Sequence, residues 1–192
     1  MIAIIDYKAG NTGSVGFALE RLGFDFRITS DHGELLEADK VIFPGVGSAG
    51  EAMQRLRDSG LDEILPKLTQ PVLGICLGMQ LMCRHSQEDD TFGLGIFDVD
   101  VKRFPDKLRV PHTGWNDVAF ENLSAFENLE KQPDLYFVHS YFVPINAYTT
   151  AVCDYGIRFS AGLKKDNFHA FQFHPEKSGK TGAKLLKNFL ES

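Results

Sequence analysis

The first half of the chain alternates short apolar runs with segments whose apolar residues recur every three or four positions. The short runs predict buried strands, and the longer period predicts amphipathic helices. Two helices are expected to end at Gly23 and Gly60, because glycine readily closes a helix in the left-handed conformation. The expected strands are IAIID (2–6), DFRIT (25–29), KVIFPG (40–45) and PVLGI (71–75), and the expected helices are TGSVGFALERLG (12–23) and GEAMQRLRDSG (50–60).

The second half changes to short alternating or aromatic runs separated by turn residues. The pattern as a whole predicts an open, mostly parallel sheet with helices on both faces and a mixed or antiparallel extension in the second half. No linker or repeat interrupts it, so residues 1–192 are expected to form a single domain. The later strands are GIFDVDVKRF (95–104), WNDVAF (115–120), LYFVHSYFVP (135–144), TTAVCDYG (149–156), RFSAGLKKD (158–166) and FHAFQFHP (168–175), before a helix in GAKLLKNFLES (182–192) with Leu185, Leu186, Phe189 and Leu190 facing inward.

Composition is that of an ordinary soluble protein, with 43% hydrophobic and 24% charged residues. A net charge of -6 argues against nucleic acid or an anionic membrane as the main partner. No apolar run approaches the roughly 20 residues of a membrane span, and the start MIAIIDYKAG lacks the features of a secretory signal. A cytoplasmic protein is therefore expected. The histidines and cysteines show no metal-binding spacing, so we expect neither a metal nor a cofactor.

A cysteine stands where the strand PVLGI meets a helical segment, in the pentapeptide GICLG (74–78). This spacing is the thiol form of the nucleophile elbow, a strained strand-to-helix turn that exposes its central side chain. A helix starting at Leu77 would favour a thiolate at Cys76 and aim the Leu77 amide at a developing oxyanion. On these five residues alone, a buried structural cysteine is an equally good interpretation. Cys83, expected within the same helix, and Cys153 are assigned to packing.

A cysteine nucleophile needs a base, and the segment FHPE (173–176) offers one. Residues two apart in an extended segment point to the same side, so His174 and Glu176 can meet. Pro175 pushes His174 towards the extended conformation. A lone histidine at a strand end is usually structural, but this pair in a chain with a cysteine elbow indicates a base and its orienting carboxylate.

Taken together, GICLGMQ (74–80) and FHPE (173–176) resemble the class I, triad-type glutamine amidotransferases. In that family a Cys-His-Glu triad releases ammonia from the side-chain amide of glutamine. The resemblance spans the whole chain and includes FPGVGSAGEAM (43–53), PHTGWND (111–117), YFVHSYF (136–142) and HPEKSG (174–179), with Thr113 where the family more often has methionine. It implies that Cys76 is the nucleophile, that His174 is the general base and acid, and that Glu176 orients His174.

The resemblance also implies further site residues. Gly45, Val46 and Gly47 match the oxyanion strand, whose amides would join that of Leu77, and a flip of the Gly45–Val46 peptide is expected to complete the hole. The implied substrate-binding residues are Gln80, Glu88, Ser140 and Tyr141, with Glu88 suited to the α-ammonium group. Without the resemblance, Glu88 in the polar stretch SQEDD would be interpreted as a solvated acid.

Ammonia released for synthesis must pass directly to an acceptor site, because free ammonia becomes ammonium at neutral pH. One domain has no room for that second site, so we expect a heterodimer. The resemblance implies a cyclase subunit with a (β/α)8-barrel fold as the partner. The candidate interface residues are Asn11, Trp115, Tyr136 and Lys177, with His112 and His139 supporting these segments; the two aromatics could equally belong to the core.

Other interpretations stay open at this point. The chain could serve another synthase, of the aminobenzoate or pyridoxal phosphate type, although PHTGWND and YFVHSY argue against it. A cysteine peptidase or γ-glutamyl hydrolase would need no partner. A non-catalytic binding module on a flavodoxin-like sheet need not keep Cys76, His174 and Glu176 together.

Overall fold

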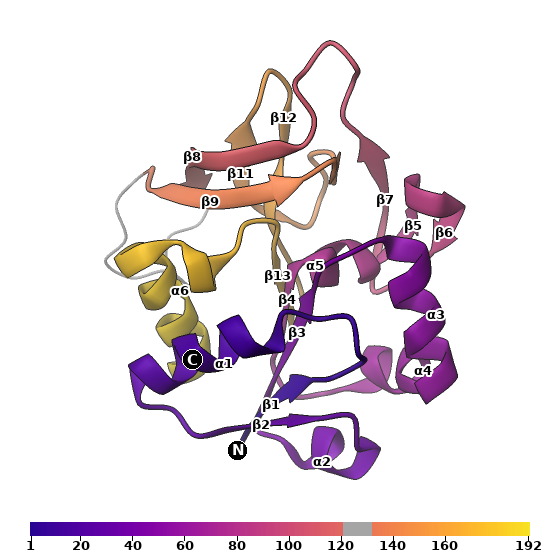
Figure 1. Ribbon diagram of the computed structural model, residues 1–192, viewed down its shortest axis with the longest axis vertical. Helices are drawn as coiled ribbons and strands as arrows, with labels where there is room; N and C mark the ends of the chain where they lie inside the picture. The colour runs from indigo at the N-terminus through magenta and orange to yellow at the C-terminus, as the bar shows by residue number, and fades with distance from the viewer. Residues whose placement is uncertain (121–131) are drawn as a thin grey trace.

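The computed structural model describes residues 1–120 and 132–192, and within them nine strands form one large sheet (Figure 1). Their order is β2-β1-β3-β4-β13-β12-β11-β8-β9, parallel as far as β13 and antiparallel beyond it. This confirms the predicted parallel sheet with an antiparallel extension. The strands are β1 (Ile2–Ile5), β2 (Phe26–Thr29), β3 (Lys40–Gly45), β4 (Val72–Cys76), β8 (His112–Phe120), β9 (Asp134–His139), β11 (Thr149–Asp154), β12 (Arg158–Lys165) and β13 (Phe168–Phe171).

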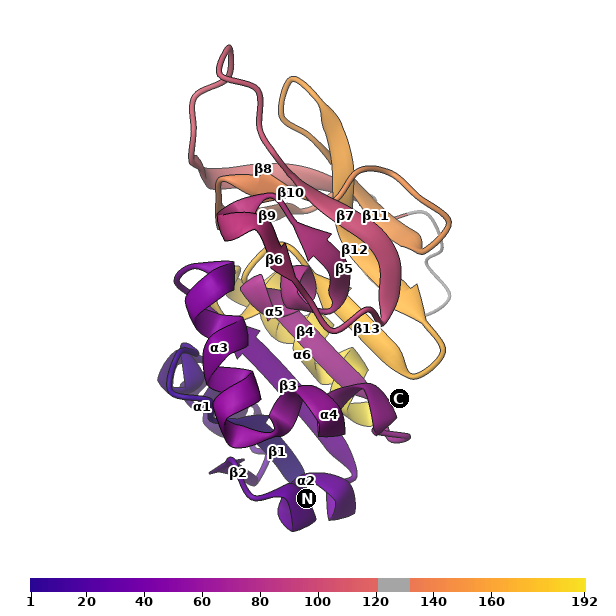
Figure 2. The same cartoon turned by 90° about the vertical axis from the view of Figure 1, so that its right-hand side faces the viewer.

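Helices cover both faces of the parallel strands, as predicted. Helices α1 (Thr12–Leu22) and α6 (Gly179–Glu191) lie on one face, and α3 (Ala49–Ser59) and α4 (Leu61–Ile64) on the other (Figure 2). Gly23 and Gly60 end α1 and α3 in the left-handed conformation. The apolar residues of α6 predicted to face inward, from Leu185 to Leu190, are buried.

A second sheet departs from the prediction. Strands β10 (Tyr141–Phe142), β7 (Phe97–Arg103), β5 (Cys83–Ser86) and β6 (Thr91–Phe92) form a separate four-stranded sheet, so residues 95–104 do not extend the main one. Helix α5 (Leu77–Leu81) is short, and Cys83 starts β5 instead of continuing the helix. The four residues of β5, CRHS, are too few for periodicity to distinguish helix from strand, and pairing of β5 with β6 and β7 decides the outcome. Helix α2 (His32–Glu37), capped by Asp31, was not predicted.

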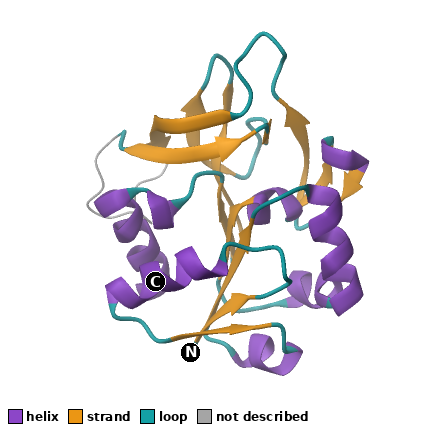
Figure 3. Ribbon diagram, in the orientation of Figure 1, coloured by secondary structure: helices purple, strands orange, loops and turns teal. Residues whose placement is uncertain are grey.

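The core has one part on each side of the sheet. One part lies under α3, α4 and α5. The other lies under α1 and α6 and continues into aromatic residues beneath the antiparallel strands, among them Phe104, Phe137 and Phe159. Figure 3 shows the strand-rich upper part facing the ends of the parallel strands. No helix in the described ranges has the length and apolar character needed to cross a membrane.

Candidate active site

Cys76 occupies a sharp corner between β4 and α5. Its backbone has φ 54 and ψ -110, a region that L-residues rarely adopt, which confirms the predicted strained turn. The flanking glycines make the corner possible. A Cβ on Gly78 would lie 2.0 Å from the carbonyl oxygen of Phe43, and one on Gly74 would lie 2.8 Å from Met82 Sδ. Without side chains there, β3, β4 and α5 pack closely around the cysteine.

A cavity of about 440 Å³ opens beside this corner. It brings together the predicted nucleophile and base, three of the four predicted oxyanion residues and all four predicted substrate-binding residues. The fourth oxyanion residue, Gly45, pairs in register with Cys76 at the ends of β3 and β4. The lining residues are Val46, Gly47, Cys76, Leu77, Gln80, Glu88, Pro111, Val138, His139, Ser140, Tyr141 and His174.

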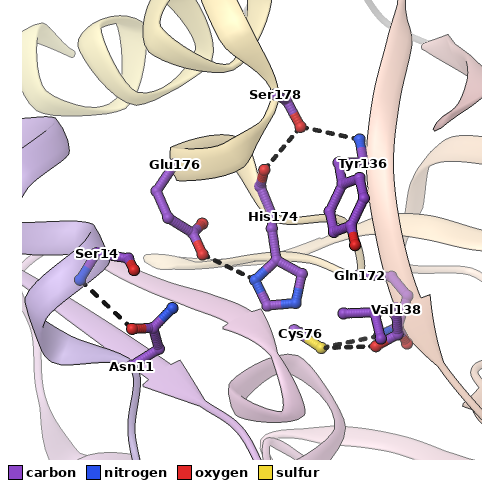
Figure 4. Close-up of polar contacts among 9 residues, drawn as sticks. All are labelled: Asn11, Ser14, Cys76, Tyr136, Val138, Gln172, His174, Glu176 and Ser178. Atoms are coloured by element: carbon purple, nitrogen blue, oxygen red, sulfur yellow. Dashed lines mark hydrogen bonds and ion pairs between the residues drawn. The ribbon is translucent and has the colours of Figure 1, made fainter. Parts of the chain in front are cut away.

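His174 and Glu176 form a buried pair (Figure 4). Nδ1 of His174 lies 2.8 Å from Oε1 of Glu176, and both side chains are almost fully enclosed. The contact was predicted, but the predicted backbone is wrong. His174 is extended, whereas Pro175–Lys177 form a 3₁₀ turn that begins at the proline. Proline suits the first position of such a turn, and the turn brings the carboxylate back to the imidazole.

The other ring nitrogen of His174 faces the cysteine. Nε2 is buried without a hydrogen bond in the described ranges, and Figure 4 places the Cys76 sulfur beside it. Burial by itself lowers the pKa of His174, but the neighbouring Cys76 and Glu176 outweigh burial and raise that pKa. The two neighbours therefore favour the protonated form of His174.

Two further groups touch the sulfur, and neither was predicted from the sequence. Cys76 Sγ lies 3.7 Å from the carbonyl oxygen of Val138 and 3.8 Å from Nε2 of Gln172. Gln172 stands two residues before His174 in an extended segment, so the alternation of side chains along a strand is a signal from which its position could have been predicted. The Val138 contact uses the backbone, and side-chain patterns carry no signal for that.

One amide of the predicted oxyanion segment already has a hydrogen-bond partner. The amide of Val46 donates to the carbonyl oxygen of Ala9 at 3.3 Å. Gly47 follows with φ 97, a conformation that favours glycine. The Leu77 amide starts α5 directly after Cys76. The Leu77 amide is therefore next to the sulfur, whereas the Val46 amide is engaged elsewhere.

The predicted substrate residues line the same cavity. Glu88 is half-buried, and its Oε2 accepts a hydrogen bond from the Ala49 amide at 3.0 Å. Desolvation raises the pKa of Glu88 against the opposing effect of that hydrogen bond. Glu88 is therefore not a fully solvated acid. Gln80 donates from Nε2 to the Tyr141 carbonyl at 3.0 Å and to Gln172 Oε1 at 2.9 Å.

The candidate interface residues surround the same end of the molecule. Trp115 is 57% exposed and packs edge-on against Tyr136, its register partner on β9, with ring centroids 6.0 Å apart. Trp115 is therefore not a core residue. Lys177 is exposed in the 3₁₀ turn, and Asn11 caps α1 by accepting from the Ser14 amide at 3.4 Å. Figure 4 shows Asn11 and Tyr136 on opposite sides of His174.

Comparison with known proteins first defines the class. The family model of glutamine amidotransferase class-I matches residues 3–192, and the chain belongs to this family. A crystal structure of a glutamine amidotransferase shares the fold with a TM-score of 0.78 at 18% identity, covering 100% of this chain and 98% of that one. The structure of PurLQS from Thermotoga maritima gives 0.75 at 18% identity, covering 99% and 97%.

Within the family, the chain falls in one group, imidazole glycerol phosphate synthase subunit HisH. The HisH of Bacteroides thetaiotaomicron is 56% identical over 193 residues, covering 99% of this chain and 98% of that protein. The HisH of Haemophilus influenzae is 48% identical over 192 residues, covering 99% and 96%. The HisH of Escherichia coli is 47% identical over 193 residues, covering 99% and 98%.

Proposed function

We propose that this chain is the glutaminase subunit of an imidazole glycerol phosphate synthase in histidine biosynthesis. It hydrolyses glutamine to glutamate and ammonia and passes the ammonia to a separate cyclase subunit. The observation that carries this proposal is the cavity that Cys76 and His174 line together with Gln80 and Glu88. The relatives support the assignment, because they are named as subunits of that synthase.

The chemistry follows from the triad that we propose. The Cys76 thiolate attacks the side-chain amide carbon of glutamine, and the imidazolium of His174 protonates the departing nitrogen, so that ammonia leaves. A glutamyl thioester remains on Cys76. His174 then takes a proton from water, the resulting hydroxide displaces the thiolate, and glutamate is released. Glu176 holds the ring so that Nε2 faces the sulfur.

The oxyanion hole of this mechanism is incomplete in the arrangement described above. Gly45, Val46 and Gly47 are proposed to supply amides alongside that of Leu77. Because the Val46 amide donates to Ala9, the Gly45–Val46 peptide must rotate before it can serve an oxyanion. Removing one oxyanion donor typically lowers the rate by roughly 10²–10³-fold, so the resting subunit is expected to be slow.

The proposed partner is a cyclase subunit with a (β/α)8-barrel fold, bound at Asn11, Trp115, Tyr136 and Lys177. The backbone of Tyr136 supports a coupling to the triad. Its carbonyl accepts from the His174 amide at 2.9 Å, and its amide donates at 2.9 Å to Ser178 Oγ, which donates to the His174 carbonyl at 2.7 Å. A partner pressing on β9 would therefore act on the segment that carries the base. A cytoplasmic location stays a prediction.

The test is glutamate release from glutamine by the chain alone and with a cyclase subunit and its nucleotide ligand. We expect low activity alone, strong stimulation by the liganded partner, and none with Cys76→Ser. Equal activity with and without the partner would contradict the coupled-subunit proposal and favour a γ-glutamyl hydrolase. Stimulation by the cyclizing subunit of another synthase instead would reassign the partner.

The proposed interface has its own test in the stimulated reaction. Trp115→Ala is expected to reduce stimulation at limiting partner concentration while leaving the unstimulated rate intact, because the ring lies outside the cavity lining. Phe92→Ala is the matched control, since Phe92 is 68% exposed but lies on β6 of the second sheet. Equal effects of the two variants would argue against the Trp115 surface as the interface.

A further inference from the structure

A chain of hydrogen bonds runs from the half-buried Asn116 on β8 to the buried sulfur of Cys76. It begins at Asn116, whose Oδ1 accepts from the Asp117 amide at 2.9 Å. The amide nitrogen of Asn116 therefore points the other way, where it donates to the Asp154 carbonyl at 3.0 Å and to His112 Nε2 at 3.3 Å. Nε2 of His112 is thus an acceptor, and the proton of this ring sits on Nδ1.

Two histidines continue this series of hydrogen bonds towards the cysteine, and the hydrogen bonds define which nitrogen of each ring carries the proton. Nδ1 of His112 donates to Nε2 of His139 at 2.9 Å, and Nδ1 of His139 donates to the Tyr141 carbonyl at 2.7 Å. Burial lowers the pKa of His112 to about 4 and that of His139 to about 3, so both rings are neutral at pH 7. If His139 were protonated, its Nε2–H group would face the Nδ1–H group of His112.

Two glutamines complete the path to the sulfur. The Tyr141 carbonyl also accepts from Gln80 Nε2, whose second hydrogen goes to Oε1 of Gln172. With its oxygen occupied in this way, Gln172 turns its Nε2 towards Cys76 Sγ. Gln172 is 0% exposed and Gln80 only 5%, so the orientation of both amides depends on protein groups.

The sulfur therefore lies between an acceptor and a donor. The Val138 carbonyl at 3.7 Å suits a thiol, because the S–H can donate to it. The N–H of Gln172 at 3.8 Å suits a thiolate, because a donor stabilises the negative sulfur. Once the proton has moved to His174, the carbonyl repels the sulfur and the glutamine attracts it.

We propose that Gln172 is a catalytic residue that stabilises the Cys76 thiolate, and that His112 and His139 are positioning residues that hold the Gln172 amide in its donating orientation through Tyr141 and Gln80. The inference rests on the proposed role of Cys76 as nucleophile. Its first test measures the sulfur directly, without glutamine turnover, so that the two proposals can fail separately.

The first experiment follows alkylation of Cys76 by iodoacetamide as a function of pH, with the modified peptide quantified by mass spectrometry. In Gln172→Glu, a carboxylate of the same shape replaces the donor, and the midpoint should rise by about one pH unit or more because like charge disfavours the thiolate. In Gln172→Met, which only loses the donor, the rise should be smaller. A wild-type midpoint in either folded variant overturns the proposal.

The second experiment separates positioning from packing at His139. His139→Phe keeps the aromatic contacts with Phe104 and Phe159 but removes both ring nitrogens. His139→Asn loses those contacts but keeps an N–H for the Tyr141 carbonyl. Positioning predicts that His139→Phe lowers kcat and raises the alkylation midpoint more than His139→Asn does. The reverse order would show that the ring only fills space, and glutaminase activity in Cys76→Ser would instead refute the nucleophile.

Discussion

At the scale of single residues, the candidate triad is defined by enclosure as much as by contact. Glu176 is almost fully buried, binds His174 Nδ1 and leaves Oε2 without a hydrogen bond in the described ranges. Removing a carboxylate from water is unfavourable unless a nearby opposite charge or hydrogen bonds compensate for the lost hydration. The imidazolium of His174 supplies the neighbouring opposite charge, so Glu176 has an electrostatic role in addition to orienting the ring.

Glu176→Gln tests that role. The amide keeps the shape but loses the charge, and an N–H facing Nδ1 would force the proton of His174 onto Nε2. We expect kcat for glutamine hydrolysis to fall by roughly 10²–10⁴-fold, as for other orienting carboxylates. KM should change little, because Glu176 does not line the cavity. Glu51→Gln is the control, because Glu51 is an exposed acid paired with Arg55. A kcat of Glu176→Gln within twofold of wild type would contradict the prediction.

The sequence predicted the triad residues because each stands in a short local motif. It did not reveal the Val138 carbonyl, since backbone direction at a strand end depends on how β9 crosses the sheet edge. It also missed the engagement of the Val46 amide with Ala9, a contact between two loops far apart in sequence. Contacts of this kind arise from tertiary packing, which one-dimensional patterns do not encode.

At the scale of elements, the corner at Cys76 depends on close approach of α5 to β3. The strands and long helices were predictable from periodicity and glycine caps. The second sheet was not, because β5 has only four residues, CRHS, and the alternating pattern of β7 suits a strand of either sheet, so that only tertiary pairing assigns them. The short α5 has five residues, too few for its own periodicity, and its position is fixed by Gly74 and Gly78.

Gly78→Ala tests this dependence on close packing. Its Cβ would meet the Phe43 carbonyl at 2.0 Å, so β3 and α5 must separate. Overpacking of this kind typically costs about 1–3 kcal/mol of unfolding free energy, and glutaminase activity should fall with the displaced Leu77 amide. Gly13→Ala in α1, with open space around its Cβ, should instead stabilise by about 0.5–1 kcal/mol. Denaturant unfolding checks both, and equal effects would refute the packing argument.

At the scale of the whole molecule, the site lies where the two parts of the sheet meet. The parallel strands bring Cys76 and the segment before His174 to their carboxyl ends, and the antiparallel extension lays β9 across them. His112 and His139 lie beneath this junction, buried among aromatic rings. Their neutral state therefore links the stability of the junction to pH.

The free energy of unfolding should decrease as pH falls from about 6.5 towards 5. The folded-state pKa values of His112 and His139, about 4 and about 3, lie below the ordinary 6.5, so the unfolded chain binds more protons in this window. The slope from His139 alone should grow to about 1.4 kcal/mol per pH unit as the unfolded ring becomes fully protonated towards pH 5. His174, with its raised pKa, stays protonated in the folded state, so it opposes this trend near pH 6.5, where the unfolded histidine is about half protonated, and it ceases to contribute towards pH 5. Denaturant titrations check this, and an unchanged slope in His139→Phe would contradict it.

The left-handed backbone at Cys76 has a consequence for the evolution of duplicated copies of such a chain. Glycine occupies a φ of 54 without strain, so folding alone would favour glycine at this position. A duplicated copy no longer selected for the reaction could therefore exchange cysteine for glycine, which would relieve the backbone strain and give up the packing of the buried side chain. The strained backbone at this position is thus explained by the catalytic function proposed for Cys76, and its replacement in a related chain would indicate that the chain has lost the activity.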